Sequence, residues 1–408
     1  MTAPLSLPLA PSLPARRLAP GPAFWLKGAI LMTFLAASSV PSPLYALYRS
    51  MWGFSALTLT VVFASYAIAL LAALLVFGGL SDYRGRREVV LGSLALEIVA
   101  MLLFWRADSV GWLLAARILQ GVATGIATSA LGAGLVDLRP ARGALVNSLA
   151  PMLGLGVGAL ASSALIQLAP APTRLVFDIL VVLLALQLAA SFFLPETAQR
   201  RPGALRSLLP TIGIPARARS TLLRVLPLNT AGWALGGFYF SLGPTLAAVV
   251  TGNRAPVIGG VMIAALSLSS VAAMALTRTV QPRAVVAISG WALGLGILLT
   301  LAGMHWASPG VALAGTMIGG AGFGAAFSSS LRSLVPLAQA HERAGLMAGF
   351  LVASYLAFSV PAIIAGLLTS HYGLQATALG YGLAAAALAI ASVVTPRPRQ
   401  SSVCCAAT

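Results

Sequence analysis

Ten residues, GGLSDYRGRR from Gly78 to Arg87, separate two long apolar stretches of the chain, at 55–77 and 89–105. The glycines allow a tight turn and a close approach of the flanking segments, and Asp82 can form ion pairs with the arginines that follow it. Such a charge cluster can be made in one conformation and broken in another. An ordinary basic loop has no need of an aspartate at this point, so the stretch predicts a conformational lock.

The composition around this stretch is that of a membrane protein. Of the 408 residues, 59% are hydrophobic and only 8% are charged, whereas soluble domains have about 25% charged residues. This excludes soluble, disordered and disulfide-scaffold classes. The net charge of +17 does not indicate nucleic-acid binding, because the basic residues lie in short segments between apolar runs.

The chain contains twelve apolar stretches, each near the ~20 residues that cross a bilayer. These runs are unbroken rather than alternating, which favours helices over the strands of a barrel. We therefore expect an all-α membrane protein with twelve transmembrane helices, at about 25–45, 55–77, 89–105, 111–135, 144–166, 175–194, 228–250, 256–276, 284–303, 310–331, 345–370 and 376–395.

A segment rich in proline and arginine divides the spans into two groups of six. We expect five parts along the chain: a disordered cytoplasmic tail at 1–23, a six-helix half at 24–195, a basic cytoplasmic linker at 196–224, a second six-helix half at 225–396 and a cytoplasmic tail at 397–408. With both termini inside, twenty basic residues face the cytoplasm and four face the outside, as the positive-inside rule requires.

The two halves are weakly similar in sequence. The fourth span carries Gly121, Gly125 and Ser129, and the tenth carries Gly320, Gly324 and Ser328 at the same spacing. Small residues at this spacing also pack membrane helices in general. Their matching position in each half nevertheless favours two pseudo-symmetric halves, an arrangement typical of secondary transporters.

The stretch from Gly78 to Arg87 resembles the signature of the major facilitator superfamily in the loop between helices 2 and 3, G-x-L-a-D-r-x-G-r-k. Tyr83 departs from the signature, and the matching residues are Gly78, Leu80, Asp82, Gly85, Arg86 and Arg87. The resemblance implies a twelve-helix fold and a lock between this loop and helices 4 and 11. Asp137 is then the partner of Arg86 or Arg87, and the start of helix 11 near Gly345 attracts Asp82.

The fourth span contains RILQGVATG, from Arg117 to Gly125, which resembles the superfamily motif R-x-x-Q-G-x-G-A at Arg117, Gln120 and Gly121. Arg117 lies ~9 Å into the helix. A charge at that depth is costly and is functional by default. The alternative is an arginine that extends to the outer interface.

Two further motifs resemble exporter branches of the superfamily. APMLGLGVG, from Ala150 to Gly158, partly matches the antiporter motif G-P-x-x-G-G, with Ala150 and Leu155 in place of glycines. PET, Pro195 to Thr197, follows the sixth span as it does in drug exporters. Both similarities indicate a branch that exports drugs or small organic molecules.

Only two carboxylates lie within spans, Glu97 in the third and Asp178 near the outer end of the sixth. A proton-coupled transporter needs a titratable group in the membrane. Glu97 is the better candidate, because it lies ~12 Å from the inner end of its helix. The alternatives are a structural carboxylate paired with helix 4 for Glu97 and an interfacial residue for Asp178.

Neutral and aromatic residues dominate the helices that line the cavity in this superfamily. Tyr45, Trp233 and Tyr239 are candidates for this lining, although any one of them could simply contribute to packing. Such a surface suits a small, partly apolar organic compound. The three histidines are scattered and no hydrolase motif is present, so we expect no catalytic residue, metal or cofactor.

These observations predict a monomeric secondary transporter in the bacterial inner membrane. It would move a small organic molecule by alternating access, as a proton-coupled exporter. An uptake symporter or uniporter for a small metabolite is the alternative within transport. A non-transporting membrane receptor or assembly factor is the alternative of another class, against which the complete lock motif argues.

Overall fold

The computed structural model describes residues 17–209, 212–253, 255–339 and 342–394. Most of the first predicted tail and all of the second lie outside these ranges. The helices of the first half are α1 (Pro20–Ser39), α2 (Pro41–Trp52), α3 (Ala56–Phe77), α4 (Leu80–Arg84), α5 (Arg86–Arg106), α6 (Val110–Leu138), α7 (Pro140–Leu168) and α8 (Pro172–Ser191).

The second half follows a linker that contains the short 3-10 helix η1 (Arg206–Leu208). Its elements are α9 (Ala216–Ser241), α10 (Gly243–Thr251), α11 (Pro256–Leu276), α12 (Pro282–His305), α13 (Pro309–Leu334), η2 (Val335–Leu337), α14 (Arg343–Tyr372) and α15 (Leu374–Val394). In the described part of the chain, eleven helical stretches are long and apolar enough to span a membrane, or twelve when a bent pair is counted as one span. The all-helical fold class is therefore confirmed.

Prolines begin many of these helices. Seven of the elements above start at a proline, where the missing N–H costs nothing because the first turn has no intrahelical acceptor for it. The predicted spans agree with the helices to within a few residues for most of the chain, because apolar runs of this length end where charged and helix-starting residues occur.

The first and seventh spans differ from the prediction. The first runs from Pro20 to Trp52 as two helices in succession, and is longer than the predicted 25–45. The seventh is α9 followed by α10, bent by 70° at Leu242. In addition, α9 begins at Ala216, inside the stretch predicted as linker.

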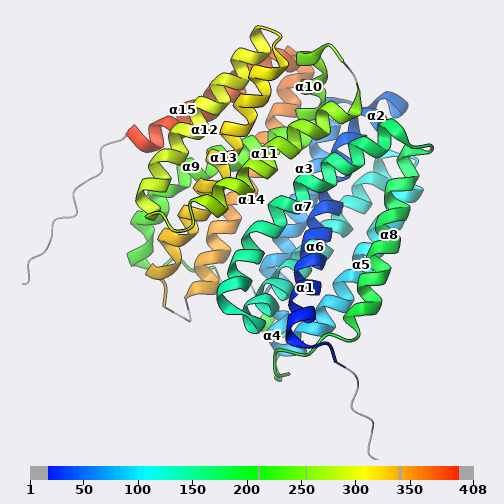
Figure 1. Cartoon of the computed structure of the whole chain (residues 1–408), viewed down its shortest axis with the longest axis vertical. Helices are drawn as coiled ribbons and strands as arrows, with labels where there is room; N and C mark the ends of the chain where they lie inside the picture. The colour runs from blue at the N-terminus through cyan, green and yellow to red at the C-terminus, as the bar shows by residue number, and fades with distance from the viewer. Residues whose placement is uncertain (1–16, 210–211, 254, 340–341, 395–408) are drawn as a thin grey trace, which may run out of the picture.

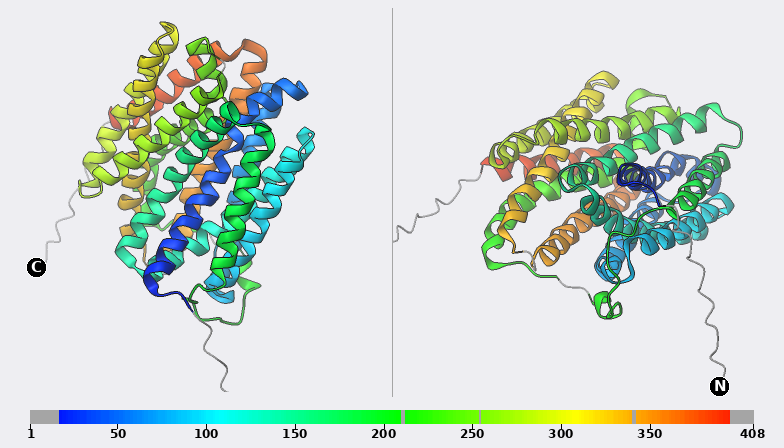
Figure 2. Two further views of the ribbon diagram at one scale, coloured as in Figure 1. Left: turned by 45° about the vertical axis from the view of Figure 1, so that its right-hand side comes forward. Right: turned by 60° about the horizontal axis from the view of Figure 1, so that its bottom comes forward.

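The two halves lie side by side, the first coloured from blue to green and the second from green to red (Figure 1). Helix α3 packs against α14, and α7 packs against α11, so two helix pairs join the halves. The helices α2 and α10 lie at one end of the bundle and α4 lies at the other (Figures 1 and 2). We call these the α2/α10 end and the α4 end.

Glycines allow the halves to touch closely near the α2/α10 end. Any side chain at Gly366 of α14 would collide with Thr60 of α3, and any side chain at Gly260 of α11 would collide with Ser163 of α7. Small residues let helix backbones approach in this way in membranes. The described conformation is therefore closed between the halves at this end.

Candidate functional site: a charged network at one end and a buried arginine in the bundle

The predicted lock residues meet at the α4 end. Arg86 Nη1 lies 2.5 Å from Asp82 Oδ1, and Arg86 Nε lies 3.3 Å from Asp137 Oδ2. The same guanidinium donates to Ser81 Oγ at 2.5 Å. Arg86 thus ties the loop after α3 to the end of α6. Asp137 is the partner that was predicted for Arg86 or Arg87.

Glu196 completes this network and was not predicted as part of it. Its carboxylate accepts hydrogen bonds from the backbone N–H groups of Arg86 (2.8 Å) and Arg87 (3.1 Å) at the start of α5. A carboxylate is favoured at a helix N-terminus, where the N–H groups have no intrahelical acceptor. Thr197 Oγ1 also donates to Asp137 Oδ2 at 3.0 Å. The PET segment was the available signal in the sequence.

Gly85 has two structural reasons to be glycine. Its φ of +102° is one that L-residues rarely adopt. A methyl group at this position would also lie 2.6 Å from Glu196 Oε2. Gly78 occupies the end of α3, where the chain turns toward α4.

The predicted approach of Asp82 to the start of helix 11 is not the arrangement that the structure describes. The Asp82 side chain is 57% exposed and pairs with Arg86. Gly345, at the start of α14, packs instead against Gly213 of the linker. The start of α14 is therefore covered by the chain that joins the two halves.

A buried lysine, Lys27 of α1, also lies near the lock and was not predicted. Its side chain is 1% exposed and packs against Gly134 of α6, one turn before Asp137. Its Nζ hydrogen-bonds to no described residue, while Asp137 and Glu196 attract it electrostatically and Arg86 repels it. Lys27 thus places an ionisable side chain behind the lock, next to Asp137 and Glu196.

Arg117 lies inside the first half and is fully buried. Its Nη1 donates to the backbone carbonyl of Ser38 in α1 and to Gln120 Oε1, each at 2.8 Å. Three aromatic rings surround the guanidinium, at 4.6 Å for Tyr66, 5.8 Å for Tyr45 and 5.9 Å for Phe63. The guanidinium therefore points into the bundle and not to the outer interface.

Gln120 links this arginine to Glu97 of α5. Gln120 Nε2 donates to Glu97 Oε1 at 3.2 Å, and both side chains are fully buried. Glu97 Oε2 and Arg117 Nε hydrogen-bond to no described residue. The row Arg117–Gln120–Glu97 thus joins α6, α5 and, through Ser38, α1.

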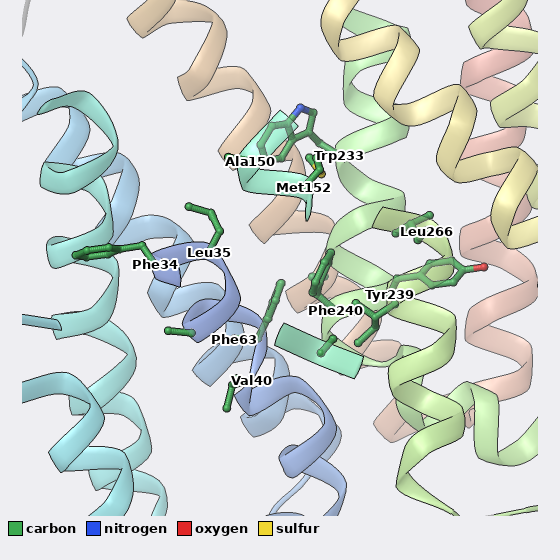
Figure 3. Packing of buried hydrophobic residues seen from close by; sticks show 14 of the residues in the cluster. Phe34, Leu35, Val40, Phe63, Ala150, Met152, Trp233, Tyr239, Phe240 and Leu266 are labelled. Carbon is green, nitrogen blue, oxygen red and sulfur yellow. The ribbon is translucent and has the colours of Figure 1, made fainter. Parts of the chain in front are cut away.

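The remaining candidates fall in three environments. Tyr45 lies beside Arg117, and its hydroxyl has no described hydrogen-bond partner. Asp178 is exposed on α8. Tyr239 is bonded through its hydroxyl to Thr316 (2.7 Å) and Thr300 (3.4 Å) within the second half, and its ring points away from Phe63 (Figure 3).

Trp233 lies in an aromatic cluster of the second half. Its ring centroid is 5.1 to 5.9 Å from those of Tyr355, Phe358, Phe327 and Phe323. One turn earlier on α9, Asn229 Nδ2 donates to Ser354 Oγ at 2.9 Å. The Trp233 N–H and the Asn229 carbonyl oxygen are buried without a described hydrogen-bond partner, which leaves one donor and one acceptor free. Asn229 was not predicted.

Comparisons with known proteins agree with this architecture. A mutant of the nucleoside transporter NupG superposes with a TM-score of 0.70 and 13% identity, over 91% of this chain and 98% of that one. The human organic anion transporter MFSD10 (TETRAN) superposes with a TM-score of 0.63 and 18% identity, over 92% of this chain and 100% of that one. At these identities the similarity establishes the fold alone.

No curated protein matches the chain in sequence. The profile of the Major Facilitator Superfamily, however, matches residues 28–281, which is more than half of the sequence. This family places the protein among membrane transporters and not among enzymes. The chain therefore belongs to the major facilitator superfamily.

Proposed function

We propose that the protein exports a small organic molecule across a bacterial inner membrane by alternating access, in exchange for protons. The observation that carries the proposal is the buried row Arg117–Gln120–Glu97. Ionisable side chains inside a membrane are expensive and commonly serve the movement of ions or substrates. This row contains both a fixed cation and a carboxylate that can take up or release a proton.

The α4 end faces the cytoplasm in this proposal. The loop of Arg84, Arg86 and Arg87 and the arginine-rich linker lie at that end, in accord with the positive-inside rule. Both termini are then cytoplasmic. The lock formed by Arg86, Asp82 and Asp137 holds α4, α5 and α6 together on the cytoplasmic side, and its rearrangement accompanies the exchange of conformations.

The coupling runs through Gln120. An ionised Glu97 accepts the Gln120 N–H as a charge-assisted hydrogen bond, which is stronger than a bond to a neutral carboxyl group. Protonation of Glu97 weakens this bond and frees Gln120 to turn. Gln120 also holds Arg117 at 2.8 Å, so the change reaches the ring of aromatic residues around the guanidinium and the backbone of α1.

The substrate contacts are the aromatic residues and free polar groups that the two halves present. Tyr45 and Tyr66 lie beside Arg117 in the first half, and Trp233 and Asn229 offer a free N–H and a free carbonyl in the second. Such groups suit a partly apolar molecule with at least one hydrogen-bonding group. A monomer is sufficient, because both halves belong to one chain.

Transport assays in vesicles test this proposal. Everted vesicles that contain the protein should accumulate labelled small organic compounds when their interior is acidified, and a protonophore should abolish accumulation. Exchange of substrate without any effect of a pH gradient would indicate a uniporter. Accumulation that needs protons to move with the substrate would indicate a symporter, and binding without transport would indicate a receptor.

A further inference from the structure

A cavity of about 520 Å³ opens at the α4 end of the first half, between α3, α5, α6 and the linker. We call it the linker pocket. It is lined near its entrance by Arg84 and Glu88, and deeper by Phe77, Leu96 and Ile126. Leu96 is eight residues beyond Glu88 on α5, so the pocket extends about 12 Å along the helix. That depth is close to one leaflet of a hydrocarbon core about 30 Å thick.

The linker forms one wall of this pocket and also exposes leucines to its surroundings. Leu205 and Leu208 line the pocket, yet Leu205 is 82% exposed and Leu209 is 70% exposed. Leucines in a charged segment at the end of a membrane bundle are stable where they enter the headgroup and acyl boundary. The linker pocket is therefore at the level of the lipid headgroups.

The entrance of the pocket carries positive charge. Arg84 is exposed and forms no ion pair with a described residue, and Arg201 is exposed beside it, its backbone N–H donating to Tyr83 O at 3.0 Å. Glu88 is neutralised by an ion pair with Arg200. The entrance therefore combines an arginine without a described ion pair, Arg84, with a glutamate that is paired with Arg200, and the backbone of Arg201 is held beside Tyr83.

The pocket does not belong to the transport pathway. None of its lining residues comes from α9 to α15, whereas a substrate site that is exposed alternately to the two sides must lie between the halves. An occupant of the linker pocket would remain on one side of the protein throughout the cycle.

We propose that the linker pocket binds an anionic phospholipid, with the phosphate at Arg84 and Arg201 and an acyl chain against Phe77, Leu96 and Ile126. The bound lipid contacts both α5 and the linker immediately beside Gly85, Arg86 and Arg87. It therefore stabilises the lock from the membrane side. The proposal does not depend on the substrate, direction or coupling of transport.

Gly92 offers a direct way to fill the pocket. It lines the cavity, and a Cβ atom there meets no other atom within 4 Å. Gly92→Leu puts a leucine into the acyl site, and it favours the helix because glycine is a poor helix former. The matched control is Gly380→Leu in α15, where a Cβ atom also meets nothing within 4 Å and no pocket residue is near in the sequence.

The experiment is native mass spectrometry of the full chain in detergent, with added phosphatidylglycerol or phosphatidylcholine, together with the unfolding temperature. We expect wild type and Gly380→Leu to retain one phosphatidylglycerol preferentially and to unfold at higher temperature with it, and Gly92→Leu to lose both effects. Arg84→Gln should weaken phosphatidylglycerol binding by about fivefold, the worth of one basic residue at an anionic surface.

Three results would overturn the proposal. Gly92→Leu could retain phosphatidylglycerol as wild type does, which would place the lipid elsewhere. Phosphatidylcholine could bind equally well, so that the charge of the lipid has no effect. Inorganic phosphate alone could raise the unfolding temperature as much as the lipid does, which would make the ligand a free anion.

Discussion

Arg117 and Glu97 are connected through the side chain of Gln120, which accepts a hydrogen bond from the arginine at 2.8 Å and donates one to the glutamate at 3.2 Å. The Gln120 amide can rotate about its side-chain bonds, whereas a direct ion pair between Arg117 and Glu97 would hold both charged groups in place. Because Arg117 also holds the carbonyl of Ser38, a change at Glu97 can reach α1 without any movement of the charges across the bundle.

Arg117→Ala should abolish transport. The substitution leaves the Gln120 oxygen and the Ser38 carbonyl buried without their donor, and each such loss costs about 1–3 kcal/mol. Arg117→Lys retains the charge but lacks the planar guanidinium that bonds to Ser38 and Gln120, so partial activity is expected. Transport is compared with Arg174→Ala, whose guanidinium packs on Trp105 at an exposed position of α8. Wild-type transport by a folded Arg117→Ala protein would exclude a role in the cycle.

Asp82→Asn should severely reduce transport and leave membrane insertion intact. Asp82 is largely exposed, so its ion pair with Arg86 contributes at most about 1 kcal/mol to stability. We expect the substitution to change the balance between conformations instead. Arg86 would keep only Asp137 as an acidic partner, so the conformation in which the lock is formed would be less favoured. The control is Asp108→Asn, which removes an exposed carboxylate from the loop before α6. Equal initial rates for the two variants, at equal amounts in the membrane, would contradict the lock.

Gly85→Ala should impair the lock through its backbone and through Glu196. A φ of +102° costs an L-residue about 1–3 kcal/mol, and the new methyl group would displace the Glu196 carboxylate that lies 2.6 Å from its position. Gly203→Ala separates the two effects, because Gly203 has the same φ of +102° but a Cβ atom there makes only an ordinary contact, 3.7 Å from the Tyr83 ring. We expect Gly85→Ala to lose more transport than Gly203→Ala, and equal losses would leave backbone strain as the whole cause.

The sequence predicted the spans because they depend on a local feature, the length of each apolar run. The meeting of Arg86 with Asp137, 51 residues further along the chain, was expected only from the resemblance to the superfamily motif. It did not predict Lys27 or Asn229 as parts of polar sites. Lys27 is at the start of a span, where lysines normally reach water, and only the packing of α1 on Gly134 shows that it is buried. Tyr239 was predicted to line the cavity, but its hydroxyl bonds to Thr316 and Thr300 inside the second half. The face of α9 on which its ring lies depends on helix packing, which residue spacing alone does not determine.

Glu97→Gln is the sharpest test of coupling. The amide preserves the size of the side chain and can still accept the Gln120 N–H, so folding and the position of Arg117 should change little. It cannot take up a proton in the physiological range, so transport should lose its dependence on the pH gradient while binding and exchange of substrate continue. The measurement is accumulation against exchange in the same vesicles, with Asp178→Gln as the control because that carboxylate is exposed on α8.

Gradient-driven accumulation that survives in Glu97→Gln but fails in Asp178→Gln would move the coupling to α8. If the pH gradient has no effect on the wild type either, the proton has no part in the cycle, and the buried row then serves only to hold α1, α5 and α6 together.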